Sequence, residues 1–153
     1  MHTVNTIELK LIQEASDSKG SLCEVQLNQK NTEIFIRGKV LEQAIWVREN
    51  RYLIFTTDEV VFEESLNIYL IDLQKGVLDK LWIGQPYNTD TFNGVQIIND
   101  HSLTFNFLYV KDWKLTIYDE PKLRPSIYSW LVLFNGWRGC RYLTLRSVDE
   151  TIG

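Results

Sequence analysis

The sequence predicts an all-β protein, namely a single-domain antiparallel β-sandwich or open barrel with room for one short helix. Hydrophobic and polar residues alternate with a period of two along much of the chain, and turn-forming residues separate these short stretches. Aromatic residues, which favour strands, make up 12% of the composition. With 153 residues, 44% of them hydrophobic, the chain suits one domain with one core, spanning residues 1–153.

The clearest pattern lies between residues 103 and 117. Leu103, Phe105, Phe107 and Tyr109 would share one face of an extended strand, and residues 113–117 alternate in the same way. Lys111-Asp112 between the two stretches predicts a turn, so the pair is expected to form a hairpin. Pro121 and Pro125 then predict the end of the regular pattern.

The other strands are expected from the same alternation. Residues 66–73 are apolar on both faces and should form a central strand. Glu49-Asn50 predicts a tight hairpin turn, and Gly38 predicts a bulge or a close approach between backbones. Residues 126–134 fit either a buried strand or a short helix capped by Ser126. The remaining expected strands are residues 4–13, 23–27, 34–36, 44–47, 52–56, 77–83, 95–98 and 141–148.

The sequence also predicts a compartment. The first twenty residues include Glu8, Lys10, Glu14 and Asp17 and contain no uninterrupted apolar stretch, which argues against a secretory signal. The longest apolar run, residues 130–134, is far too short to span a membrane. We therefore expect a cytoplasmic protein without membrane contact, in which Cys23 and Cys140 are reduced thiols.

No motif in the sequence identifies a reaction. In Asp100-His101-Ser102, neighbouring side chains of a strand would point to opposite faces, so a polar turn is favoured over a catalytic triad. The two histidines and two cysteines form no metal-binding unit, and residues 88–99 depart from a calcium loop at several ligand positions. Phosphate-binding glycine motifs are absent. We expect no metal, no cofactor and no enzymatic activity.

The sharpest functional feature is an acidic segment. Four acids occur between residues 58 and 64 and flank a short apolar centre. Such a cluster suits either a solvated loop or a docking surface for a cationic partner. On the docking hypothesis, the candidate partner-binding residues combine this segment with the long loop that begins near residue 84, and they are Asp58, Glu59, Phe62, Glu63, Glu64, Trp82, Tyr87 and Asp90.

The basic C-terminal segment offers an alternative. Residues 121–148 contain five basic residues and no acid, whereas the whole chain has a net charge of −4. Arginines interleaved with aromatics are typical of single-stranded nucleic-acid binding, and the relevant residues are Arg124, Arg138, Arg141, Arg146, Tyr128, Trp130, Trp137 and Tyr142. The acidic body disfavours nucleic acid, and the arginines can equally pair with that body.

In size, acidity, β-content and lack of catalytic motifs, the chain resembles the small cytoplasmic immunity proteins of bacterial contact-dependent growth inhibition (polymorphic toxin) systems. The resemblance covers the whole chain in overall organisation and transfers no residue. It implies an inhibitor that binds a cognate basic toxin domain, often a nuclease, and blocks its site. Two other classes stay open: a ligand-binding sandwich or barrel with Trp82, Tyr87 and Phe92 as stacking groups, and a small enzyme with a site built from scattered residues.

Overall fold

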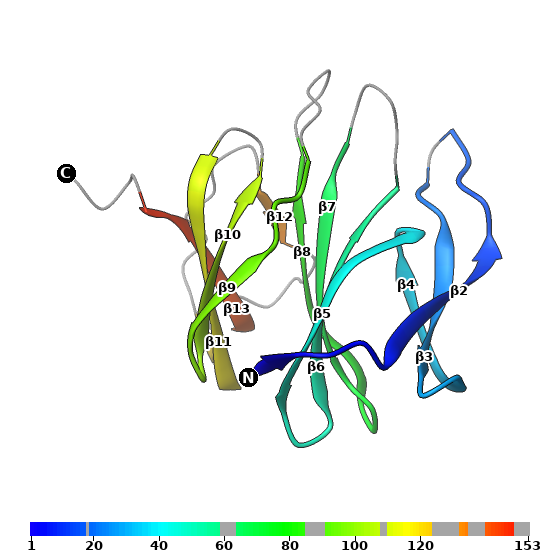
Figure 1. Cartoon of the computed structure of the whole chain (residues 1–153), viewed down its shortest axis with the longest axis horizontal. Coiled ribbons are helices and arrows are strands. Elements are labelled where there is room, and N and C mark those ends of the chain that lie inside the picture. Colours follow the sequence, from blue (N-terminus) through cyan, green and yellow to red (C-terminus); the bar gives the residue numbers. More distant parts are fainter. Residues whose placement is uncertain are drawn as a thin grey trace.

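The computed structural model describes residues 1–17, 19–58, 64–84, 91–107, 110–123, 132–134 and 140–148. Within these ranges the elements are all β-strands, and every pairing between them is antiparallel. The predicted all-β antiparallel fold is therefore confirmed, and it takes the form of open, stacked sheets (Figure 1).

The strands form three sheets. The central sheet has six strands in the order β1 (His2–Thr3), β5 (Val40–Arg48), β6 (Arg51–Thr57), β7 (Leu66–Asp72), β8 (Gly76–Ile83) and β12 (Val132–Phe134). A second sheet has the order β13 (Cys140–Ser147), β11 (Val110–Leu123), β10 (Ser102–Phe107) and β9 (Val95–Asn99). The third consists of β2 (Ile7–Gln13), β3 (Leu22–Leu27) and β4 (Lys30–Arg37).

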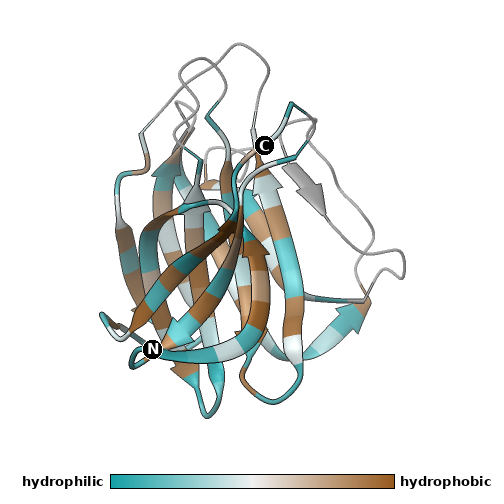
Figure 2. Cartoon of the chain, turned by 90° about the vertical axis from the view of Figure 1, so that its right-hand side faces the viewer, coloured by the Kyte–Doolittle hydropathy of each residue, from teal (hydrophilic) through white to brown (hydrophobic). Residues whose placement is uncertain are grey.

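The central sheet is covered on both faces, which makes a stack of three layers. One hydrophobic cluster joins it to the four-stranded sheet, and a second joins it to the three-stranded sheet. Strand β7 shows the division directly, because Leu66, Ile68 and Leu70 face the first cluster. Tyr69 and Ile71 face the second. Figure 2 shows the corresponding alternation of hydrophobic and hydrophilic residues along the strands.

Several local predictions are confirmed. Strand β7 is buried at every residue and lies between β6 and β8, as its two apolar faces indicated. The hairpin at residues 49–50 joins β5 to β6, with Glu49 at a φ of 46°. Gly38 marks a close approach, although its neighbour is a side chain and not a second backbone: its φ is +101°, and a Cβ there would lie 2.2 Å from Oγ1 of Thr56. Cys23 is a buried free thiol.

The predicted turn at Lys111-Asp112 is wrong. Both residues lie inside β11, because Phe107 already pairs with Val110. Asp112 instead forms an irregularity with a φ of 61°, where its N–H donates to Oδ1 of Asn106 at 2.7 Å. Tyr109, expected on the apolar face of the preceding strand, lies outside the described residues.

The predicted break at Pro121 is also wrong. Strand β11 continues through this proline, which falls in a shift of register between Ile117 and Lys122. Proline is tolerated at such a bulge because no ladder hydrogen bond needs its missing N–H. Pro125 lies outside the described part of the chain.

The ambiguous segment, residues 126–134, ends in a strand. Residues 132–134 form β12 and pair with β8, whereas residues 126–131 lie outside the described part of the chain. The strand alternative is therefore correct for the described residues of this segment.

Candidate interaction site

The two segments that carry the predicted partner-binding residues begin and end at neighbouring strand ends. Leu66, at the start of β7, pairs with Ile83 at the end of β8, and Thr56 near the end of β6 pairs with Asn67. The connection from β6 to β7 and the connection from β8 to β9 are therefore tethered at the same end of the central sheet. Of the predicted residues, Glu59, Phe62, Glu63, Tyr87 and Asp90 lie outside the described residues, whereas Asp58, Glu64 and Trp82 lie within them.

Asp58 is an anchor at the base of the acidic segment. Its Oδ1 accepts the Ser21 N–H at 3.2 Å, and its own N–H donates to Oε1 of Glu64 at 3.2 Å. A Cβ at Gly20 would lie 2.7 Å from Oδ2 of Asp58, so the carboxylate rests against the backbone of the three-stranded sheet's loop. Asp58 is only half-exposed, and it fixes where the segment starts.

Trp82 packs on its own strand at this end of the sheet. It pairs with Asn67 of β7 on one side and Leu133 of β12 on the other. A Cβ at Gly84 would lie 2.4 Å from Cζ2 of Trp82, so the indole ring occupies the space that a side chain at position 84 would need. The ring is half-buried and leaves part of its surface at the end of β8.

Sequence reasoning missed a polar cluster beside Trp82 that consists of Arg37, Tyr69 and Lys80. The Nζ atom of Lys80 lies 5.1 Å from the centroid of the Tyr69 ring, whose hydroxyl oxygen accepts the Arg37 N–H at 2.9 Å. The Arg37 guanidinium donates to the carbonyl oxygen of Gly20 at 3.0 Å. Arg37 therefore connects β7 to the same loop that holds Asp58.

Electrostatics tie this cluster to Asp58. Burial lowers the pKa of Lys80, the positive charge of Arg37 lowers it further, and the carboxylate of Asp58 acts in the opposite direction. Burial raises the pKa of Tyr69 to about 12, against the hydrogen bond from Arg37. Burial, followed by the charges of Asp58 and Glu14, raises the pKa of the Cys23 thiol, which keeps it protonated and unreactive.

The sequence signal for this cluster was the position of two charged residues, Asp79 and Lys80, within the alternating pattern of β8. Lys80 and Trp82 lie on one face of β8, while Asp79, Leu81 and Ile83 lie on the other face. A charged residue on each face of a largely buried strand indicates that each face offers it a polar partner. The identity of those partners depended on the packing of three sheets and was not encoded locally.

The arrangement suits recognition. It offers a half-exposed indole, a carboxylate held by a backbone N–H, and two cations that are already in contact with aromatic or carbonyl groups. Among the described residues, no group of three potential metal ligands occurs.

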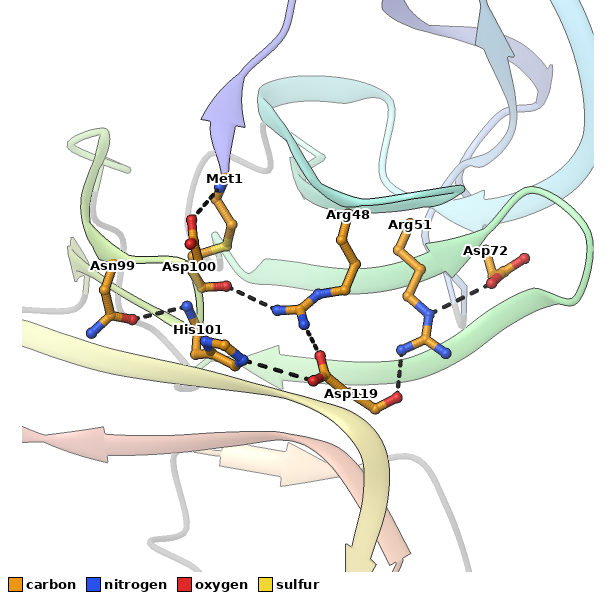
Figure 3. A network of polar contacts seen from close by, with 8 residues as sticks. All are labelled: Met1, Arg48, Arg51, Asp72, Asn99, Asp100, His101 and Asp119. Atoms are coloured by element: carbon orange, nitrogen blue, oxygen red, sulfur yellow. Dashed lines mark hydrogen bonds and ion pairs between the residues drawn. The ribbon is translucent and has the colours of Figure 1, made fainter.

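The Asp100-His101-Ser102 segment forms the polar turn that the sequence favoured. Asn99 organises it, because its Oδ1 accepts the His101 N–H at 2.8 Å and the Ser102 hydroxyl at 3.1 Å. His101 is exposed and Ser102 is buried, so the two side chains diverge. The Nε2 atom of His101 faces Asp119 at 3.8 Å (Figure 3).

A charge network surrounds this turn at the opposite end of the central sheet (Figure 3). Arg48 forms an ion pair with Asp119 and donates to the carbonyl oxygen of Asp100 at 3.0 Å. Arg51 donates to the carbonyl oxygen of Asp119 at 2.6 Å and approaches Asp72 at 3.6 Å. These contacts join the central sheet to β11 and to the β9–β10 turn, so we assign the network a structural role.

Two residues invoked for the alternative functions belong to the core. Phe92, expected as a stacking group for a ligand, is buried against Phe55 with ring centroids 5.2 Å apart. Arg141, expected as a nucleic-acid contact, is buried and lies 3.0 Å from Oδ1 of Asp79. Arg141 therefore pairs with the acidic body. Arg124, Arg138, Tyr128, Trp130 and Trp137 lie outside the described residues.

The fold and this site define a class: a three-layer antiparallel β-protein with an anchored acidic connection at one end of its central sheet. The sequence matches no family model, and comparisons with curated proteins and with solved structures found no significant similarity. The part of the chain that the structure describes contains no helix with the length and hydrophobicity needed to cross a membrane.

Proposed function

We propose that this protein is a non-enzymatic inhibitor of the immunity type, which acts in the cytoplasm and neutralises a cognate basic toxin domain, such as a nuclease, by binding it. The observation that carries the proposal is the tethering of the acidic segment and the 84–94 connection at adjacent strand ends of the central sheet. This topology brings the described strand ends that flank the two segments to the same end of the central sheet.

Charge supports a basic partner. The chain has a net charge of −4, and the segment 58–64 concentrates four acids. Complementary charge accelerates the encounter of two proteins and orients them, while buried aromatic contacts contribute most of the affinity. The half-buried ring of Trp82 provides an apolar contact at the same end of the central sheet.

Binding kinetics test the proposal. The partner is recovered by pull-down from the source cell, and its association with the protein is measured by stopped flow at low and high salt. Replacing Asp58, Glu59, Glu63 and Glu64 by their amides should slow association by about tenfold or more and weaken its dependence on salt, because steering by charge is lost. The fold should persist, since an amide oxygen can still accept the hydrogen bonds of Asp58 and Glu64.

A matched control separates local charge from net charge. The amide replacements of Glu8, Glu49, Asp112 and Glu120 change the net charge by the same amount, and all four residues are exposed and lie outside the acidic segment. This control should associate at close to the unmodified rate. Equal rates for both quadruple variants would refute the docking role of the acidic segment.

Inhibition separates the proposed class from the alternatives. An immunity protein abolishes its partner's activity at a one-to-one ratio, whereas a ligand-binding module or an enzyme leaves that activity unchanged. A partner that is bound but stays fully active would contradict the inhibitor function.

A further inference from the structure

The outer face of the four-stranded sheet carries a groove that is separate from the interaction site. Its volume is about 340 Å³, and it is lined by Lys114, Thr116, Tyr118, Thr144, Arg146, Ser147 and Val148. Strand alternation explains its polarity, because Trp113, Leu115 and Ile117 of β11 enter the core and leave the intervening residues outside. The groove therefore lies on the far side of this sheet from the central layer.

The groove contains an unfavourable pair of like charges. Lys114 of β11 and Arg146 of β13 are direct register partners, and both are exposed. Neither takes part in an ion pair within the described part of the chain. Side chains that are directly opposite on one face lie close together, and like charges at such positions destabilise a sheet.

The next outward-facing pair on the same two strands supplies hydroxyl groups. Thr116 pairs directly with Thr144, two residues along from Lys114 and Arg146. Side chains two residues apart on a strand point to the same face, so the four residues form a compact array of two cations and two hydroxyls. Tyr118 follows on β11, and the Nζ atom of Lys122 lies 4.7 Å from the centroid of its ring.

We propose that this groove binds the phosphate group of a small phosphomonoester. A dianionic phosphate offsets both positive charges at once, and it accepts charge-assisted hydrogen bonds from the guanidinium and the ammonium groups. The threonine hydroxyls can donate to its remaining oxygens. The volume lies in the range of small-molecule sites, and the compact array favours a small ligand over a polymer in a chain with a net charge of −4.

The like-charge pair allows a specific test, because removing one of its charges should weaken phosphate binding and at the same time stabilise the ligand-free protein. The full chain is studied by thermal unfolding and by isothermal titration with inorganic phosphate as the probe, against chloride at equal ionic strength. Phosphate should raise the Tm of the unmodified protein, because a ligand of the folded state stabilises it. Lys114→Gln and Arg146→Gln should each weaken phosphate binding by about tenfold or more while raising the ligand-free Tm at low salt.

Lys30→Gln is the matched control, because Lys30 is an exposed strand lysine on the three-stranded sheet. It should leave phosphate binding unchanged. Adenosine monophosphate and a single-stranded oligonucleotide are titrated in parallel, and the monophosphate should bind at least as tightly as phosphate.

Three results would overturn the proposal. The first is a phosphate effect no larger than that of chloride. The second is a lower ligand-free Tm in Lys114→Gln, which would mean that the lysine has an acidic partner elsewhere in the chain. The third is tighter binding of the oligonucleotide than of the monophosphate with a steeper salt dependence, which would identify a nucleic-acid surface.

Discussion

At the scale of single residues, two side chains of β7 stabilise the fold in different ways. Leu70 on β7 is fully buried in the cluster between the central and four-stranded sheets. Asp72, two residues later, is buried at the end of the same strand and accepts hydrogen bonds from the N–H groups of Gln74 and Lys75 at 2.9 and 3.2 Å. Leu70 therefore contributes through apolar packing, and Asp72 contributes through a carboxylate that is hydrogen-bonded by the N–H groups of the following turn.

We expect Leu70→Ala to lower the free energy of unfolding by about 2–5 kcal/mol, because it removes buried apolar atoms and leaves a cavity between two sheets. Urea denaturation measures the change. Val77→Ala is the control, since Val77 is 43% exposed and its truncation should cost less than about 0.5 kcal/mol. Equal losses in the two variants would place Leu70 outside the core.

Asp72 predicts a dependence of stability on pH. Burial acts to raise the pKa of Asp72, but the N–H groups of Gln74 and Lys75, together with Arg51, outweigh burial and lower it. An acid whose folded pKa is depressed contributes stability that is complete above its unfolded pKa of about 3.9 and is lost as the pH falls through the folded pKa. Asp72→Asn should therefore be less stable at neutral pH, and the difference should shrink in acid.

Chemical denaturation of both proteins between neutral and strongly acidic pH measures this difference. Comparing the two proteins at each pH removes the contributions of other groups, such as Asp79, whose pKa burial raises in spite of Arg141. A difference that stays constant over the whole range would contradict the role of the ionised Asp72.

At the scale of elements, close approach between strands decides where a side chain is forbidden. Gly38 follows β4 and lies against Thr56 of β6, whose hydroxyl donates to the carbonyl oxygen of Arg37 at 2.7 Å. Gly76 at the start of β8 also has a positive φ, of 89°, but a Cβ there would meet nothing within 4 Å. The two glycines share a positive φ and differ in packing.

We therefore expect Gly38→Ala to destabilise the protein clearly more than Gly76→Ala. Gly76→Ala should cost on the order of 1 kcal/mol from the left-handed backbone alone. Gly38→Ala adds a clash with Oγ1 of Thr56 and disrupts its hydrogen bond. Thermal unfolding of both variants makes the comparison, and equal losses would show that packing at Gly38 can relax.

At the scale of the whole molecule, polar contacts hold the outer layers to the central sheet. Asp79 of β8 is buried, and its Oδ2 accepts the N–H groups of Tyr142 and Leu143 of β13 at 3.0 Å each. Its Oδ1 lies 3.0 Å from Nη2 of Arg141, which also donates to the carbonyl oxygen of Lys80 at 3.0 Å. This set of contacts ties β13 to the central sheet beside the apolar cluster.

Removing this link should weaken the stack. We expect Asp79→Ala to cost about 3–5 kcal/mol, because it leaves the Arg141 charge buried without its carboxylate. Hydrogen exchange should show the largest loss of protection in β11 and β13, which pair along most of their lengths. Asp17→Ala, at an exposed position, should change neither quantity. A uniform loss of protection in all three sheets would show instead that the layers unfold as one unit.

The sequence by itself determined the fold class and much of the local structure. Period-two alternation identified the strands, and the two apolar faces of residues 66–73 identified the central one, because alternation and burial are properties of a strand and its immediate layers. The acidic segment was also visible as a local concentration of charge. The predicted turn at Asp112 and the predicted break at Pro121 were wrong, because the strand continues through a local backbone irregularity at both places.

Only the tertiary structure decided which charges have partners. Arg141 and Arg146 are close in sequence and alike in chemistry, yet one is buried against Asp79 of another sheet and the other faces Lys114 in an exposed groove. The same holds for Lys80 and Arg37, which meet at Tyr69 because the three-stranded sheet packs on the central one. These contacts join residues from separate sheets, and the stacking of sheets follows from the burial of whole faces, which no local pattern specifies.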